Sequence, residues 1–151
     1  MAELQVISSL YLPIGEGYLL LPNVSVAEVV EYIRPQDRDG VPEFYLGDIV
    51  WRGLALPLIS FEVANGGPKP KKSADVRIAV LNSVGSDSKK LPFLALLTQG
   101  IPRLVKVSSE LIKEDGEPQG PAESSRVKVD GEPAIIPNLP YLESLVLPTK
   151  K

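Results

Sequence analysis

The residues that usually perform enzyme chemistry near neutral pH are missing from this sequence of 151 amino acids, which contains no cysteine and no histidine. Without cysteine there are no disulfides, thiolate nucleophiles or cysteine-ligated zinc sites. Without histidine there is no Ser–His–Asp triad and no imidazole ligand for a metal. We therefore expect a protein that is not an enzyme. Carboxylates, lysines and tyrosines remain, so a small β-barrel enzyme or ligand-binding domain that uses Tyr, Asp and Glu stays open as the alternative.

Other residues that could bind ions lack the spacing that such sites require. Acidic side chains gather at 37–43 and at 110–117, but neither group has the fixed spacing and the glycine of a calcium loop. Asn65-Gly66-Gly67 lacks the Gly-Lys-Ser/Thr ending of a phosphate-binding loop. Three lysines at 68–72 are typical of a solvated loop. We predict no metal, no cofactor and no nucleic-acid partner.

Charge and hydropathy favour a soluble protein in the cytoplasm. The net charge of −3 argues against the basic face that binds nucleic acid. Every apolar run is interrupted well before the roughly 18 residues that a membrane helix needs, so no direct insertion into a membrane is expected. Residues 1–10 have no basic region ahead of an apolar stretch, and a signal peptide is therefore not predicted.

The distribution of proline and glycine predicts an all-β fold. The chain holds 15 prolines and 12 glycines, which are scattered throughout and leave few windows for a helix of three turns. Between them lie short runs rich in Val, Ile, Leu and Tyr, as in a β-sandwich or barrel. These runs are 17–22, 24–33, 48–52, 54–61, 76–84, 91–97, 103–107, 126–129 and 134–136. One domain is expected over residues 1–151.

Local signals place turns, loops and two short helices. Gly53 predicts a tight hairpin at 51–53, and Asp130-Gly131 is typical of a two-residue hairpin turn. Polar segments at 65–75 and 113–125 are expected to be flexible loops. Weak helix signals occur at 108–115 and 139–146. The predicted core consists of Leu54, Leu56, Leu58, Ile59, Ile78, Val80, Phe93, Leu94, Leu96 and Ile135.

The segment at 27–62 carries a resemblance to a known family. CheW-like domains show a V-x-E-I strand, P-x-x-x-x-G, I-N-L-R-G and a strand ending in L-P-V-I-D-L. In this sequence 26–29 (VAEV), 42–47 (PEFYLG), 49–53 (IVWRG) and 56–61 (LPLISF) resemble these motifs in order and spacing. The similarity continues through 76–84 and 91–97 to 131–145, so it covers most of the chain.

The resemblance implies both a fold and a role. The fold would be two small, intertwined five-stranded β-barrels packed over a shared core. The role would be that of a non-catalytic adaptor in a bacterial chemosensory array at the inner membrane. It would couple the cytoplasmic tip of methyl-accepting chemoreceptors to the regulatory domain of a CheA-type histidine kinase, which shares this fold. Trp51 replaces the usual Leu and Ser60 the usual Asp, and these departures favour a variant from a type IV pilus (twitching motility) system.

The resemblance also implies a protein-binding surface around the 49–53 turn. Arg52 matches the family's receptor-binding Arg, and Glu28 matches a Glu on the neighbouring strand, although a solvated edge charge is an equal alternative for Glu28. Trp51 is either a binding anchor or a core residue. Because neighbouring strand residues face opposite sides, we expect Arg52 to point outward and Trp51 inward. Ile49 and Gly53 complete the predicted surface.

Overall fold

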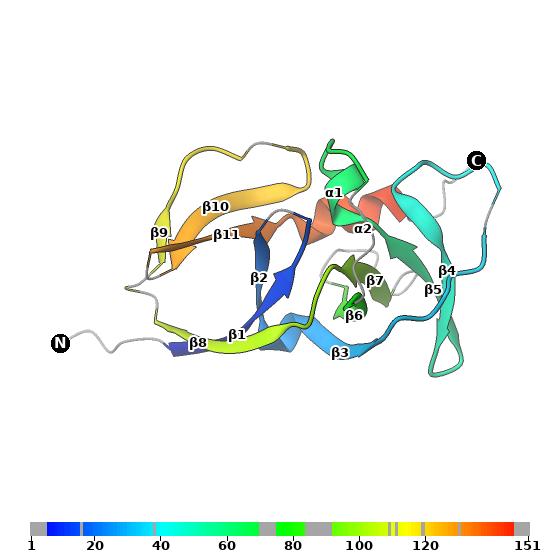
Figure 1. Cartoon of the computed structure of the whole chain (residues 1–151), viewed down its shortest axis with the longest axis horizontal. Coiled ribbons are helices and arrows are strands. Elements are labelled where there is room, and N and C mark those ends of the chain that lie inside the picture. The colour runs from blue at the N-terminus through cyan, green and yellow to red at the C-terminus, as the bar shows by residue number, and fades with distance from the viewer. Residues whose placement is uncertain are drawn as a thin grey trace.

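The chain folds into two β-sheets joined by a common core. The computed structural model describes residues 6–15, 17–37, 39–69, 75–83, 92–108, 110, 112–118, 120–129 and 131–146. Within these residues, strands alternate with turns, and the longest helix has 8 residues. Figure 1 shows the two sheets side by side, with the short helices α1 and α2 where they meet. The predicted all-β fold is confirmed.

The first sheet contains strands from both ends of the chain. Its order is β8-β1-β2-β11-β10-β9, and the only parallel pair in that order joins β11 to β2 through Ile135 and Leu19. The bounds of these strands are β1 Val6–Pro13, β2 Tyr18–Pro22, β8 Arg103–Ser108, β9 Ile112–Glu114, β10 Glu123–Val129 and β11 Glu132–Pro137.

The second sheet is built from the middle of the chain. Its order is β3-β6-β7-β5-β4, with β5 parallel to β7 and the other pairs antiparallel. The chain therefore starts in the first sheet, builds the second and returns to the first. The bounds are β3 Val26–Glu31, β4 Tyr45–Trp51, β5 Leu54–Ile59, β6 Arg77–Asn82 and β7 Phe93–Thr98. The helices are η1 Asn23–Ser25, α1 Phe61–Ala64 and α2 Leu139–Val146.

Each of the nine apolar runs overlaps a strand, but two strands were not predicted. The first sheet has six strands in the described residues instead of five, because the short β9 adds to its edge. The short helix expected at 108–115 is largely wrong: of the described residues there only Glu110 is helical, in a 3-10 conformation, whereas Ser108 ends β8 and Ile112–Glu114 form β9 by pairing with β10. β1 was missed because two serines, one of them the buried Ser9, interrupt its apolar pattern.

Other local predictions have mixed outcomes. The helix expected at 139–146 is confirmed as α2. The loop expected at 113–125 is shorter than predicted, because β9 and β10 occupy its two ends. Residues 70–74 of the other expected loop, and Asp130 of the predicted hairpin turn, lie outside the described residues. Gly131 has a φ of 82°, and β10 and β11 pair antiparallel on either side of this turn.

The shared core lies where the two sheets face each other. Leu12 and Leu19 of the first sheet and Leu81 and Leu96 of the second belong to one buried cluster, together with Leu142 of α2. Two further clusters fill the interior of each sheet separately, one beneath the second sheet and one beneath the first. Apolar burial therefore joins the two halves through one continuous set of contacts.

Eight of the ten predicted core residues are buried. Phe93 is half-buried. Leu54 is wrong: its side chain is 41% exposed. It is the first residue after the β4–β5 turn, and Figure 1 shows that this hairpin extends beyond the rest of the sheet. The buried residues are Leu56, Leu58, Ile59, Ile78, Val80, Leu94, Leu96 and Ile135.

Hydrogen bonds of Asn65 make a polar connection between the halves, at the buried carboxylate of Glu123. The Glu123 carboxylate of β10 accepts hydrogen bonds from Arg126 Nε at 2.7 Å and from Asn65 Nδ2 at 2.7 Å. Asn65, the residue after α1, also accepts a bond from the Ala122 amide at 2.9 Å. The hydrogen bond to Glu123 raises the pKa of Arg126. These contacts fix β10 of the first sheet to the helix that follows β5 of the second.

The contrast between Leu58 and Leu54 tests the strand register. Leu58 is fully buried, so Leu58→Ala should lower the free energy of unfolding by about 2–5 kcal/mol. Leu54→Ala removes the same atoms from an exposed site and should cost less than about 1 kcal/mol. Denaturant unfolding of both variants measures the difference. Equal losses would show that the β4–β5 register is wrong.

Candidate docking surface

A two-residue turn places Arg52 at the tip of the β4–β5 hairpin. Arg52 and Gly53 connect the strands, with φ angles of 49° and 79°. Positive φ at both central residues is the requirement of a type I′ turn, whose twist matches that of the paired strands. Gly53 has the positive φ that was predicted for this hairpin turn. Arg52 lies in the hairpin turn predicted at 51–53 and is the one non-glycine residue with positive φ in the described part of the chain.

Trp51 lies inside the second sheet. It is 8% exposed and belongs to the cluster beneath that sheet. Its ring meets Phe93 of β7 at an angle of 66°, with 4.8 Å between ring centroids. Its Nε1–H donates a hydrogen bond of 2.7 Å to Glu28 Oε1. Of the two alternatives for Trp51, the structure shows a core residue whose polar edge reaches the surface.

Glu28 receives hydrogen bonds from both neighbouring residues of the hairpin. The oxygen that accepts from Trp51 also accepts from Arg52 Nη2 at 3.3 Å. Glu28 is on β3 and Trp51 ends β4, and these strands form the two opposite edges of the second sheet. Contact between them requires the sheet to curl until its edges meet. The Glu28 carboxylate therefore closes the second sheet into a barrel.

Arg52 points outward from this closure. Its side chain is 69% exposed, whereas that of Glu28 is 39% exposed. The guanidinium carbon lies 5.0 Å from the centroid of the Trp51 ring, which is a cation–π geometry. The exposed ion pair alone stabilises little, but the ring and the carboxylate together restrict the guanidinium to a narrow range of positions. Several N–H donors of the planar fork remain available to a partner.

The hairpin around Arg52 carries exposed apolar side chains that the sequence interpretation did not include. Val50 of β4 is 63% exposed, and Leu54, which pairs with Trp51 and so lies on the other face of the hairpin, is 41% exposed. Ile49, which was predicted as a surface residue, is buried beneath the sheet. Alternation along β4 turns Ile49 and Trp51 inward and Val50 outward. We call Glu28, Val50, Arg52 and Leu54 the docking hairpin surface.

A second contact holds β4 in place at its other end. Gln36 forms two backbone hydrogen bonds with Asp48, of 2.8 and 3.0 Å. The chain between β3 and β4 thus crosses directly over Gly47, which has a φ of 134°. A Cβ at position 47 would clash with the Gln36 carbonyl and lie 2.9 Å from Pro35 Cβ. Only glycine fits this crossing, which explains the glycine that ends the 42–47 motif.

No group of three or more acidic side chains among the residues that the structure describes could hold a metal ion. None of the helices in the described residues is long and apolar enough to span a membrane.

Comparison with known proteins identifies the family. The model of the CheW-like domain matches residues 9–145, and the chain therefore belongs to this family. The solved structure of the scaffolding protein TtCheW from Thermoanaerobacter tengcongensis superposes with a TM-score of 0.76. That match covers 91% of this chain and 92% of the other at 22% sequence identity, which establishes the likeness of the fold. None of the curated protein sequences compared with this chain matches it.

The closure by Glu28 can be measured as a coupling energy. Trp51→Phe and Glu28→Ala each remove the same charge-assisted hydrogen bond, so the double variant should lose less stability than the sum of the singles. The expected coupling is about 1–3 kcal/mol. The control pairs Trp51→Phe with Glu132→Ala on the first sheet, where the effects should add. Additivity in both pairs would contradict the closure.

The crossing over Gly47 can be tested with two glycines. Gly47 and Gly40 both have positive φ, but a Cβ at Gly40 would meet nothing within 4 Å. Gly40→Ala therefore reports backbone strain alone, whereas Gly47→Ala adds a clash with the Gln36 carbonyl. The second should cost at least about 1 kcal/mol more in unfolding free energy. A similar cost for the two variants would argue against the close approach of 35–36 to β4.

Proposed function

We propose that this chain is a non-catalytic adaptor that couples chemoreceptors to a CheA-type histidine kinase in a bacterial chemosensory array. The observation that carries the proposal is Arg52, exposed on a rigid turn and fixed by Trp51 and Glu28, at the place of the Arg in the family's I-N-L-R-G motif. Membership of the CheW-like family supports it. The name of the similar structure, a scaffolding protein, agrees with an adaptor role.

The docking hairpin surface has the chemistry to bind the helical tip of a receptor. The Arg52 fork can pair with carboxylates or with the free carbonyls at the end of a helix. Val50 and Leu54 offer exposed apolar area beside it. Because the turn is already ordered, Arg52 loses little conformational entropy when a partner binds. Glu28 also faces this surface and would pair with a basic side chain of the partner.

The second partner in this proposal is the regulatory domain of the kinase, which the family resemblance describes as having the same fold. An adaptor with two docking partners needs no catalytic group of its own. Its place would be the cytoplasm, in receptor arrays at the inner membrane. Trp51 stands where the family usually has Leu, directly beneath Arg52. A Trp in place of Leu beneath Arg52 would change the position of the guanidinium and so the choice of receptor. Such a change is expected of a family member from a type IV pilus system.

Charge reversal at Arg52 tests the docking surface. Arg52→Glu should weaken binding of a receptor cytoplasmic fragment by more than about 2 kcal/mol, which corresponds to roughly thirtyfold in Kd. The fold should persist, because an exposed ion pair contributes about 1 kcal/mol or less. Isothermal calorimetry and the melting temperature of each variant measure the two effects.

Two further variants sharpen the interpretation. Lys106→Glu makes the same charge change on an exposed position of β8 and should leave the affinity unchanged. Arg52→Lys keeps the charge but removes the planar fork, and an intermediate loss is expected. If Arg52→Glu binds like the native chain, or if Lys106→Glu is equally impaired, the docking hairpin surface is not the receptor site.

A further inference from the structure

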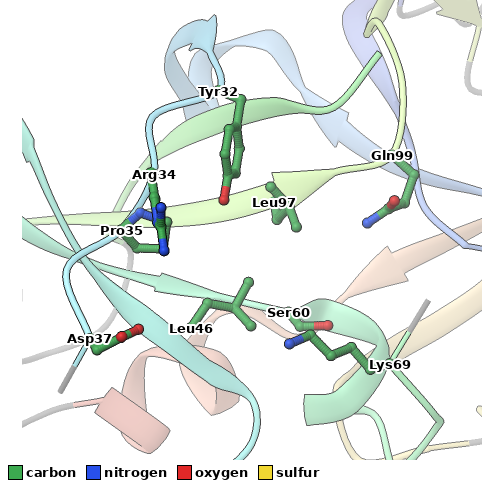
Figure 2. A pocket seen from close by; sticks show the side chains of 9 residues that line it. All are labelled: Tyr32, Arg34, Pro35, Asp37, Leu46, Ser60, Lys69, Leu97 and Gln99. Carbon is green, nitrogen blue, oxygen red and sulfur yellow. The ribbon is translucent and has the colours of Figure 1, made fainter. Parts of the chain in front are cut away.

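A small cavity opens at the other end of β3 and β4 from the docking hairpin surface. Its volume is about 230 Å³. Leu46 belongs to β4 and Leu97 to β7, and Tyr32 is the first residue after β3, so two strands and one connecting segment of the second sheet contribute to it. Figure 2 shows these side chains around a common space, with the ring of Tyr32 above and Leu46 below. The walls next to these residues are apolar.

Two exposed cationic side chains extend into this space, and neither has a partner among the described residues. Figure 2 shows the Arg34 guanidinium and the Lys69 ammonium turned toward the region between Tyr32 and Leu46, from opposite sides. No hydrogen bond or ion pair joins either group to any residue that the structure describes. Asp37 is the one acid among the described residues of the lining, against two cations, in a chain of net charge −3. A ligand with an anionic group would complement the charge of these two side chains.

The side-chain amide of Gln99 indicates a second property of the ligand, a hydrogen-bond donor. Its Oε1 is buried and has no hydrogen-bond partner among the described residues. Such orphaned acceptors are rare, and burying one costs about 1–3 kcal/mol. The backbone amide of Gln99 bonds to the Pro13 carbonyl at 2.8 Å, so the residue cannot simply move outward. A half-turn of the amide about its last bond exchanges Oε1 and Nε2, and in that orientation a ligand that supplied an N–H or O–H donor would satisfy the oxygen.

We propose that this cavity binds a small carboxylic acid that also carries an amino or hydroxyl group on an aliphatic body. The carboxylate pairs with Arg34 and Lys69. The donor group serves Gln99 Oε1, and the aliphatic part lies between Tyr32, Leu46 and Leu97. The volume is below the roughly 300–1,000 Å³ of sites for drug-sized molecules, so the ligand is of the size of a single α-amino or α-hydroxy acid.

The site goes beyond the proposed adaptor role and is independent of it. Among its described lining residues only Leu46 lies on a strand of the docking hairpin surface, β4, and none of them is shared with that surface. The nearby crossing of Gln36 over Gly47 holds the segment that carries Arg34 against β4. The cavity is therefore preformed, which lowers the ordering cost of binding.

Four probes separate the chemical requirements. L-Leucine and 2-hydroxy-4-methylpentanoate carry the carboxylate, a donor and an aliphatic body. L-Leucinamide lacks the carboxylate, and 4-methylpentanoate lacks the donor. Titration of the ¹⁵N-labelled chain should give saturable amide shifts around 32–34 and 97–99 with at least one of the first two. The last two should bind at least tenfold more weakly.

Variants of the cavity residues connect the shifts to the site. Arg34→Ala, Lys69→Ala and Gln99→Leu should each weaken the binding probe at least tenfold, whereas Lys106→Ala on β8 should not. Gln99→Leu removes the orphaned acceptor and should keep or raise the melting temperature, so loss of binding is not loss of fold. The proposal is overturned if neither complete probe saturates up to about 10 mM, or if all four bind alike.

Discussion

The second sheet depends on one carboxylate that joins its two edges. Glu28 on β3 accepts hydrogen bonds from Trp51 and Arg52 at the end of β4, although three other strands separate β3 from β4 in the sheet. The indole N–H is thereby satisfied while the ring stays in the core against Phe93. The same contact sets the position of the exposed guanidinium. The contact that closes the barrel therefore also holds the Arg52 guanidinium in its exposed position.

The first sheet stabilises the second sheet by packing against it. The chain enters and leaves the second sheet from strands of the first, so the first half consists of two separate segments with the second half between them. Leucines from both sheets pack in one cluster, and the Glu123–Arg126–Asn65 contacts add directional bonds across the join. Ser60 is the N-cap of α1 and accepts a bond from the Val63 amide. It fills the position of the family's usual Asp, another strong capping residue.

Sequence patterns predicted what depends on local chemistry and missed what depends on distant contacts. The apolar runs, the turn at Gly53 and the helix at 139–146 follow from composition and spacing along the chain. The outward position of Arg52 and the buried position of Trp51 were predicted, but from alternation within a strand, whereas Arg52 lies in a turn. The contact of Trp51 with Glu28 depends on sheet curvature, which no local pattern encodes. β9 forms only by pairing with β10, and Leu54 is exposed because the hairpin projects.

Hydrogen exchange with and without a receptor cytoplasmic fragment tests the central claim most directly, because it reports every backbone amide at once. The account predicts that the bound fragment slows exchange at 49–54 and at 26–31, the two segments that Glu28 joins, and leaves β8, β9 and β10 unchanged. Protection confined to β8, β9 and β10 would contradict it and would place the receptor on the first sheet.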